Sequence, residues 1–371
     1  MQIYFIFMGK PPFCAKFAVK NLLDMKERIL GRNLLQLREI TDSLSLPSFT
    51  AGQIAGWLYK KQVDSIDQMT NISKHARELL NERYEVGKVE YIEKLVSSDG
   101  TKKYLFPTRS EGRYIESVMI PEYEGDTSGE IHRATICVSS QVGCKMNCRF
   151  CMTARGGFHG NLDSGEILSQ FLKIDESADL TNAVFMGMGE PLDNWENVRT
   201  ALEILTAEWG FGWSPKRITL STIGVIPKLE LFLNESKCHL AVSLHNPFDE
   251  ERSAMMPVQK RFRIEDVVEL IKKYDFTGQR RVSFEYIMFA GLNDSKRHAD
   301  ALLRLLKGLE CRINLIRFHT IPDSPYVASP MQTIDFFRER LNKGGITTTL
   351  RASRGEDILA ACGLLAGKNN Y

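Results

Sequence analysis

The chain has 371 residues, of which 43% are hydrophobic and 25% are charged, and this excludes a peptide, a disulfide-stapled miniprotein and a disordered chain. Its 48 basic and 46 acidic residues give a formal net charge of +2, which neither requires nor forbids a nucleic-acid partner. The longest apolar run, Ile3 to Met8, is far too short to span a bilayer and no charged segment precedes it, so we expect a cytoplasmic protein without membrane contact.

The region from residue 25 to residue 88 has the apolar spacing of helices. Ile54, Trp57 and Leu58, and later Ile66 and Met69, recur three and four residues apart, which predicts a small helical domain. Residues 1–110 carry 17 Lys and Arg against 12 Asp and Glu, and contact with RNA phosphates explains this excess about as well as a solvated helical surface does. We assign no structure to residues 1–24, which form a leader.

Residues 89–133 are predicted to connect the helical domain to the rest of the chain. Apolar and polar residues alternate around residues 89–95 and 113–120, which indicates antiparallel strands. The segment from Pro121 to Glu130 is polar and acidic, as is typical of a loop.

Residues 134–352 alternate short β-branched runs with helical stretches, the signature of βα units around a parallel sheet. We expect strands at Ala134–Val138, Asn182–Met186, Arg217–Ser221, His239–Leu244, Val282–Met288 and Arg312–Arg317. Six units predict an α/β fold with a partial (β/α)6 barrel, and a doubly wound open sheet is the alternative. The barrel is favoured because polar residues fall at the C-terminal ends of the strands, where barrels build active sites: Glu190, Ser221, Ser243, His245 and His319.

Cys144, Cys148 and Cys151 give the strongest chemical signal in the sequence. The eight cysteines are not spaced as in secreted domains, and these three follow the first strand of the parallel region. Three thiolates suit a [4Fe–4S] cluster that keeps one iron open, whereas a structural zinc site needs a fourth ligand, for which His132 and His159 are the candidates. The C-x3-C-x2-C spacing resembles the radical S-adenosylmethionine superfamily, and this resemblance implies a cluster that cleaves that nucleotide to a 5′-deoxyadenosyl radical.

Further residues match the S-adenosylmethionine site of that superfamily. The strand end at Phe185–Pro191 resembles its glycine-rich motif, in which a carboxylate binds the ammonium group of the ligand. A satisfied polar core residue is the usual explanation for any one such residue, but their recurrence at successive strand ends favours a ligand site. The expected contacts are Gly189, Glu190, Ser221, Ser243, Leu244 and His245.

The chain also resembles the RlmN/Cfr family of rRNA adenine methyltransferases over roughly residues 34–367. The matching stretches include residues 49–61, 69–74, 115–121, 137–144, 185–194, 221–224, 243–245, 314–316 and 354–363. His319 stands where the family commonly has Asn. Because either side chain can hydrogen-bond a ribose or a carboxylate, we retain His319 as a ligand contact. The C-terminal segment, residues 353–371, carries Cys362, which matches the cysteine that the family methylates.

The resemblance implies a two-stage reaction that consumes two S-adenosylmethionine molecules per turnover. The first methylates Cys362, and the second generates a radical that activates this methyl group for addition to C2 of adenine 2503 in 23S rRNA or adenine 37 in tRNAs. Glu116 matches the base that removes the ring proton. Cys137 matches the thiol that releases the product by forming a disulfide. The resemblance also implies an electron donor such as flavodoxin, and we expect a monomer.

Three other functions remain open from the sequence. A Cfr-type enzyme would methylate C8 of the same rRNA adenine with the same catalytic residues, although residues 115–122 and 137–143 look nearer to the RlmN form. A non-catalytic RNA-binding module with a structural metal would need the cluster cysteines but neither Glu116 nor Cys362. A radical enzyme on a small molecule would leave the helical domain without a purpose. We expect Cys14, Cys238 and Cys311 to be structural.

Overall fold

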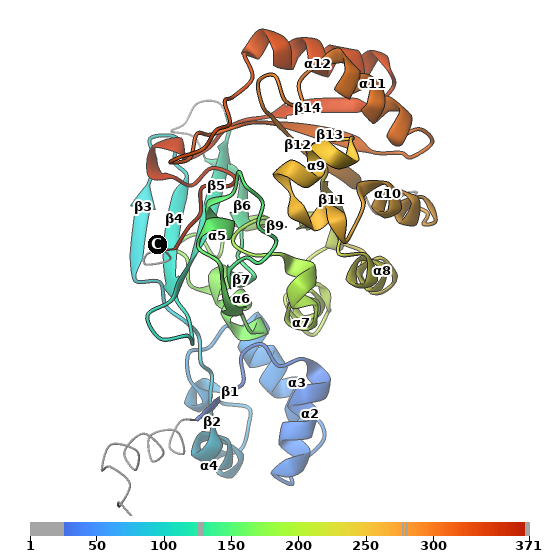
Figure 1. The fold of residues 1–371 in the computed structure, drawn as a ribbon. Helices are drawn as coiled ribbons and strands as arrows, with labels where there is room; N and C mark the ends of the chain where they lie inside the picture. Colours follow the sequence, from blue (N-terminus) through green and yellow to red (C-terminus); the bar gives the residue numbers. More distant parts are fainter. Residues whose placement is uncertain (1–25, 125–129, 277, 279–280, 368–371) are drawn as a thin grey trace, which may run out of the picture.

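A computed structural model describes residues 26–124, 130–276, 278 and 281–367 (Figure 1). The expected leader, residues 1–24, and Cys14 within it lie outside the described residues. Figure 1 shows a helical part at one end of the molecule and a large curved sheet with outer helices above it. None of the described helices is long and apolar enough to cross a lipid bilayer.

The helical part contains the elements that the apolar spacing predicts. They are α2 (Leu34–Ser43), α3 (Thr50–Ala55), the π-helix η1 (Gly56–Lys60), the 3-10 helix η2 (Ile66–Gln68) and α4 (Lys74–Arg83). A capping box between Asn33 and Gln36 starts α2, because each side chain accepts a hydrogen bond from the backbone N–H of the other residue. The short strands β1 (Glu27–Arg28) and β2 (Tyr84–Glu85) pair in parallel and close this part.

The helical part is fixed to the rest of the chain by specific hydrogen bonds. Ser164 Oγ donates to the carbonyl of Gly31 at 2.8 Å, and Asn33 Nδ2 donates to Glu203 at 3.0 Å. Close backbone packing accompanies them, since a Cβ on Gly31 would lie 2.2 Å from the backbone nitrogen of Gly165. These contacts place α2 against the start of α6 (Ser164–Leu172) and the body of α7 (Trp195–Thr206).

One ten-stranded sheet, in the order β14-β13-β12-β11-β10-β9-β6-β5-β4-β3, organises the remainder. Seven of these strands are parallel, and six of them confirm the expected ones to within a few residues. The parallel strands are β6 (Ile131–Cys137), β9 (Leu180–Phe185), β10 (Ile218–Thr222), β11 (His239–Ser243), β12 (Val282–Met288), β13 (Arg312–Arg317) and β14 (Thr347–Arg351). The seventh, β14, was not predicted.

Three antiparallel strands extend the other edge of the sheet: β3 (Glu93–Val96), β4 (Lys102–Pro107) and β5 (Tyr114–Tyr123). The prediction that a loop starts at Pro121 is wrong, because Pro121 pairs with Ala134 of β6. The last residue of β5 that pairs with β4 is Met119, so the missing N–H of Pro121 costs no hydrogen bond on that side. Residues 125–129 lie outside the described residues.

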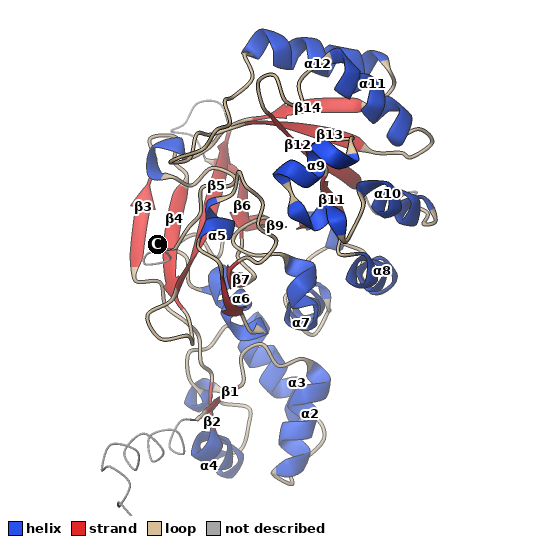
Figure 2. Cartoon of the chain, viewed as in Figure 1, coloured by secondary structure: helices blue, strands red, loops and turns tan. Residues whose placement is uncertain are grey.

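The helices between the parallel strands lie along the outer side of the curved sheet (Figure 2). They are α6, α7, α8 (Ile226–Glu235), α10 (Ile264–Lys272), α11 (Lys296–Leu305) and α12 (Met331–Lys343). In Figure 2, β3 to β6 stand upright whereas β12 to β14 run across the top, so the sheet wraps around a central space. This is the expected partial barrel; a doubly wound sheet would carry helices on both faces.

Candidate functional site

The concave side of the sheet encloses a cavity of about 460 Å³. Every second residue of the strands faces it, as the two-residue period of a strand requires. These lining residues include Thr135 and Cys137 on β6, Ser283 and Glu285 on β12, Asn314 on β13, and Thr349 and Arg351 on β14. Closed barrels fill their interior with apolar side chains, so a polar hollow here indicates a space for a ligand.

The three clustered cysteines lie in a loop between β7 (Gln141–Gly143) and α5 (Met152–Arg155) at the rim of this cavity. The two ends of the loop are joined beside the antiparallel pair of β7 and β8 (Phe158–Asn161), where the N–H of Cys144 donates to the carbonyl of Gly157 at 2.8 Å. Gly143, at φ 73°, is required there because a Cβ would lie 1.8 Å from that carbonyl oxygen. The fold therefore presents the three thiols on one short, fixed loop.

The thiols fit an iron–sulfur cluster. All three are free, and burial raises the pKa of Cys144 to about 12, with further increases from Cys151 and from nearby carboxylates. Burial likewise raises the pKa of Cys148, which Cys151 and Cys144 raise further. Thiolates that are buried together need a cationic partner, and iron is such a partner.

A single metal ion fits less well. Among the described residues, no three His, Cys, Asp or Glu side chains are grouped to hold a metal ion, whereas a cluster holds its cysteines on separate iron atoms. The two histidines considered as zinc ligands have other partners. His132 faces Glu124 at 3.5 Å, and the ring of His159 bonds to the carbonyl of Gly156 at 2.7 Å.

Arg252 is a buried cation beside Cys148, and sequence reasoning missed it. Its guanidinium donates to the carbonyls of Leu244 at 2.9 Å and Ser243 at 2.8 Å, and it also bonds to Gln259. Burial lowers its pKa to about 10, and the neighbouring Cys148 opposes this shift. Arg252 thus links the end of β11 to the cysteine loop and supplies positive charge there.

Gly189 and Glu190 form the turn after β9. Gly189 has φ 99°, and a Cβ would lie 2.5 Å from that of Gln141, so only glycine fits. The Glu190 carboxylate is buried and accepts hydrogen bonds from Thr222 Oγ1 at 2.7 Å and from the N–H groups of Ile223 and Leu192 at 3.0 Å. Burial raises its pKa to about 7. The structure thus directs this carboxylate to the end of β10, and Glu190 is not among the residues that line the cavity.

The residues expected at the ends of β10 and β11 lie at the C-terminal ends of these neighbouring parallel strands, and like Glu190 they are not among the residues that line the cavity. Ser221 and Ser243 are half-buried near the ends of their strands, and Leu244 is fully buried. The backbone of His245 has φ 56°, a conformation that residues other than glycine rarely adopt. Burial lowers the pKa of His245 to about 3, so the ring is neutral, and its edge faces the ring of Phe150 with 5.1 Å between centroids.

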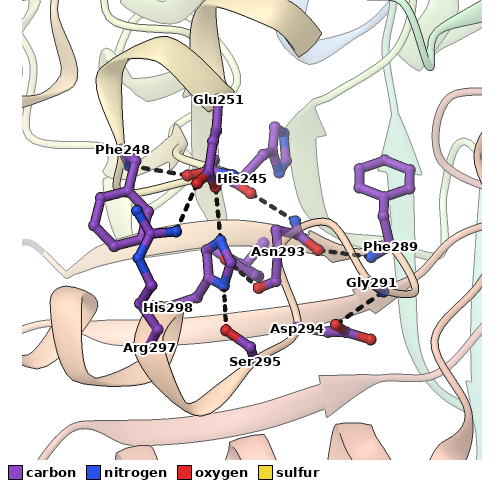
Figure 3. Close-up of polar contacts among 12 residues, drawn as sticks. His245, Phe248, Glu251, Phe289, Gly291, Asn293, Asp294, Ser295, Arg297 and His298 are labelled. Atoms are coloured by element: carbon purple, nitrogen blue, oxygen red, sulfur yellow. Dashed lines mark hydrogen bonds and ion pairs between the residues drawn. The ribbon is translucent and has the colours of Figure 1, made fainter.

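Asn293 holds the unusual backbone of His245 in place (Figure 3). Its Nδ2 donates to the carbonyls of His245 and Ile287, both at 2.7 Å, and its Oδ1 accepts from the N–H of Phe289 at 2.7 Å. Ile287 in turn donates its N–H to Nδ1 of His245 at 3.1 Å. The fixed histidine follows from these bonds, and sequence reasoning did not identify Asn293.

Figure 3 also shows a row formed by Ser295, His298 and Glu251, the residue types of a hydrolase triad. Ser295 Oγ and His298 Nδ1 are 2.7 Å apart, and His298 Nε2 and Glu251 are 2.7 Å apart. Ser295 is exposed at the start of α11, and the row does not line the cavity. The row links α11 to α9 (Asp249–Met255) and supports the turn that carries His245.

The C-terminal residues 353–367, here called the strap, cross from β14 to the β3–β4 edge of the sheet (Figure 1). At its first anchor, Asp99 accepts from the N–H of Gly355 at 3.0 Å, and Asp357 accepts from Ser97 Oγ at 2.6 Å. At its second anchor, Thr153 Oγ1 donates to the carbonyl of Leu365 at 2.6 Å. The strap therefore spans the open side of the barrel.

Cys362 lies between the two anchors and lines the cavity together with Cys137 and Cys151. Both Cys137 and Cys362 are free thiols, so the structure holds no disulfide between them. Burial raises the pKa of Cys137 to about 12, Cys362 raises it further, and Arg351 opposes the shift. The structure therefore brings these two thiols together.

Glu116 lies on β5, on the same face of the sheet as Cys137. Val118 of β5 pairs with Cys137 of β6, and Glu116 stands two residues before Val118, so its side chain points to the same face. Its carboxylate is buried, lies 3.0 Å from Nζ of Lys103, and accepts from the strap N–H groups of Ala366 at 2.7 Å and Gly367 at 3.1 Å. The strap thus covers this carboxylate.

His319 lines the cavity at the edge near the strap. Its Nδ1 pairs with Glu356 at 2.9 Å, and its Nε2 lies 3.1 Å from Ser353 Oγ. Burial lowers its pKa, and Glu356 partly opposes this. In this arrangement both ring nitrogens bond to the strap.

Comparisons with protein families support these observations. A model of the radical SAM superfamily matches residues 138–303, and a model described as the ribosomal RNA large subunit methyltransferase N-terminal domain matches residues 20–86. Among solved structures, a radical SAM methyltransferase from Sphaerobacter thermophilus superposes with a TM-score of 0.82 at 36% identity, covering 91% of this chain and 99% of that chain.

Curated relatives resemble the chain over nearly its whole length. It is 53% identical over 341 residues to a probable dual-specificity RNA methyltransferase RlmN of Bacteroides thetaiotaomicron, covering 92% of this chain and 96% of the relative. It is 54% identical over 338 residues to the protein of that name in Porphyromonas gingivalis, with coverages of 91% and 96%. The dual-specificity RNA methyltransferase RlmN of Syntrophus aciditrophicus is 42% identical over 344 residues, with coverages of 92% and 96%.

Proposed function

The chain belongs to the RlmN family of dual-specificity RNA methyltransferases, and we propose that it methylates C2 of adenine 2503 in 23S rRNA and C2 of adenine 37 in tRNAs. The observation that carries the proposal is the placement of Cys362 and Cys137 on one cavity with Cys151 of the cysteine loop. Two free thiols beside such a loop have no use in a purely structural metal site.

Cys144, Cys148 and Cys151 would hold a [4Fe–4S] cluster, and the rim residues around His245 and Ser243 would hold S-adenosylmethionine. When bound, S-adenosylmethionine would supply methyl groups, and the cluster would supply the electron that cleaves this nucleotide to a carbon radical. C2 of adenine is an electron-poor ring carbon that does not attack a sulfonium methyl group, so a radical route is needed. Arg252 and Asn293 act on this site indirectly, by fixing the backbone around Ser243 and His245.

Cys362 would accept the first methyl group on its sulfur. Loss of one hydrogen atom from this S-methyl group to the 5′-deoxyadenosyl radical would leave a methylene carbon that bonds to C2 of the base. The resulting bond joins protein and RNA through the Cys362 sulfur. Glu116 would take the C2 proton while the adduct returns one electron to the cluster. The Cys137 sulfur, having lost its proton, would then attack the Cys362 sulfur and form a disulfide; the electron pair of the broken carbon–sulfur bond stays on the methylene carbon, which takes up a proton and becomes the methyl group. An external reductant must then restore both thiols.

These reaction steps require the strap to move. Glu116 is occupied by the N–H groups of Ala366 and Gly367, so it becomes free to accept a proton when the second anchor opens. Cys362 lies between the two anchors, and the first anchor at Asp99 leaves the segment attached while the second releases.

The domains and partners follow from the same proposal. Residues 25–88 would bind RNA, and residues 89–133 would connect this helical part to the barrel. Residues 134–352 would form the catalytic barrel, and residues 353–371 would carry the methylated cysteine. With RNA substrates the enzyme would act in the cytoplasm, where a flavodoxin-like protein would supply electrons to a monomer.

The direct test is an anaerobic reaction of the reconstituted enzyme with a 23S rRNA fragment, a tRNA, S-adenosylmethionine and a reductant. Mass spectrometry of the digested RNA should find 2-methyladenosine in both. A product methylated at C8 would establish the Cfr-type activity instead. If Glu116→Ala binds RNA but yields no product, a non-catalytic module is excluded, and full activity of that variant would refute the proposed base.

A further inference from the structure

One oxygen of a buried carboxylate in the cavity has no partner. Glu285 is only 4% exposed and lines the cavity, and its Oε2 makes no hydrogen bond although it is fully buried. A buried carboxylate oxygen without a donor is costly, so native proteins rarely keep one unless a ligand supplies the donor. This atom therefore indicates a missing N–H or O–H group.

A hydrogen-bonded row across three strands fixes which oxygen of Glu285 is free. In the register of the sheet, Glu285 of β12 pairs with Asn314 of β13, which pairs with Thr349 of β14. Thr349 Oγ1 donates to Asn314 Oδ1 at 3.0 Å, and Asn314 Nδ2 donates to Glu285 Oε1 at 2.8 Å. The row fixes the orientation of the Asn314 amide. Oε1 of Glu285 therefore accepts a hydrogen bond from Asn314, and Oε2 is left without a donor.

Arg351 supplies the complementary group beside it. This guanidinium has five N–H donors, and its Nη1 donates to a weak acceptor, the sulfur of Met186, at 3.1 Å. Cys362, Glu285 and Cys137 all act on it electrostatically and raise its pKa, Cys362 most strongly. The cavity is thus lined by an acceptor at Glu285, donors at Arg351 and the thiol of Cys362.

We propose that Glu285 and Arg351 bind the Watson–Crick edge of the target adenine. Along this edge the base presents the N6 amine as donor, N1 as acceptor and then the C2 carbon. Glu285 Oε2 would accept from N6, Arg351 would donate to N1, and Cys362 would face C2. These three lining groups thus complement three adjacent atoms of the base edge, including the atom that is methylated.

This inference rests on the proposed function and adds the means by which the enzyme selects adenine. An unstacked base must be recognised inside the pocket by its hydrogen-bonding edge, because the helical stack no longer defines it. S-adenosylmethionine also carries N–H and O–H donors, so the test must separate the two sources.

The test compares RNA hairpins that contain adenine or purine, which lacks the N6 amine, at the target position. We expect the wild-type single-turnover rate constant to be about 10- to 100-fold higher for adenine. In Glu285→Gln, Asn314 still needs an acceptor, so the new amide turns its NH2 group toward the base. This variant should react slowly with adenine and lose the preference.

Matched variants locate the effect. Thr135→Val changes another lining residue on β6 and should keep the wild-type ratio. Arg351→Met should lower the rate constants for adenine and for purine by the same factor, because both bases contain N1. With 1-deazaadenine, which lacks N1, Arg351→Met and the wild type should react at the same rate. Mass spectrometry of Cys362 methylation without RNA shows that each variant is folded and binds S-adenosylmethionine.

Each outcome decides the inference. If Glu285→Gln keeps the adenine preference, the inference is wrong. If Glu285→Gln no longer methylates Cys362 in the absence of RNA, Oε2 serves S-adenosylmethionine and the inference is wrong as well. If the wild type methylates C2 but does not distinguish adenine from purine, the inference fails and the proposed function stands. If the wild type does not methylate C2, both fail.

Discussion

The Lys103 ammonium lies 3.0 Å from the Glu116 carboxylate, and each side chain is only 10% exposed. Lys103 Nζ also donates to the carbonyl of Leu359 at 3.3 Å, so it contacts the strap at the same time. One cation therefore holds both the proposed base and the segment that carries Cys362. This relationship makes Lys103 a positioning residue.

Lys103→Met should lower the free energy of unfolding by about 3 kcal/mol, because a buried carboxylate loses its counter-charge. Hydrogen exchange should also quicken at the strap N–H groups of Ala366 and Gly367, which both bond to Glu116. Lys103→Arg should restore most of this protection. Lys94→Met, which breaks an exposed pair with Asp175, is the control and should leave exchange in the strap unchanged. Unaltered exchange in Lys103→Met would refute this role.

Replacing Cys144, Cys148 or Cys151 by Ala should abolish the visible absorbance of the cluster and all radical chemistry, since two thiolates cannot hold a cluster with one open iron. Iron content and absorbance of anaerobically reconstituted protein measure this. Cys238→Ala and Cys311→Ala should retain both, at a cost of about 1–3 kcal/mol where the thiol is buried. Full activity in any of the first three variants would contradict the assignment.

Cys137→Ala should accumulate a covalent protein–RNA species, because addition proceeds but no thiolate releases the carbon from Cys362. Denaturing electrophoresis after incubation with RNA, S-adenosylmethionine and reductant detects it. The double variant Cys137→Ala/Cys362→Ala should give none. Normal turnover in the single variant, or an adduct in the double variant, would show that the two-thiol scheme does not apply.

The buried Glu190 should make the ligand-free protein less stable as pH rises. Because its folded-state pKa is raised to about 7 from 4.5, the native state binds a proton more tightly than the unfolded state. This contribution is complete below pH 4.5 and is lost as pH rises through 7, in total about 3 kcal/mol.

Glu190→Gln removes this titration. Its free energy of unfolding relative to wild type should therefore increase between pH 4.5 and 7, as urea titrations can measure. Glu196→Gln, at an exposed site on α7, is the control and should show no such trend. A pH-independent difference for Glu190→Gln would argue against the raised pKa.

Local patterns predicted the strands and the cysteine loop because these depend on neighbours in sequence. The strand β14 was missed because residues 347–351 are polar and half exposed at the edge of the sheet, so they lack a buried strand's apolar signal. Lys102 and Lys103 are adjacent, and only the sheet shows that Lys103 faces Glu116 while Lys102 pairs with Glu176.

Other groups in the site depend on long-range register. Glu285 and Arg351 are unremarkable in the sequence, and their relation appears only when β12, β13 and β14 lie side by side. The motif predicts Glu190 as a ligand contact, and its hydrogen bonds to Thr222 and Ile223 depend on how β9 and β10 meet. A motif identifies such a residue without giving the direction of its side chain.

The strap has a consequence for how the protein is made. A chain emerges from the ribosome N-terminus first, and its early parts begin to fold during synthesis. The residues that anchor the strap, among them Asp99 and Lys103, are made long before the strap itself. The cysteine loop is therefore synthesised before the segment that closes this side of the barrel. The strap, which is synthesised after all strands of the barrel, then closes this side.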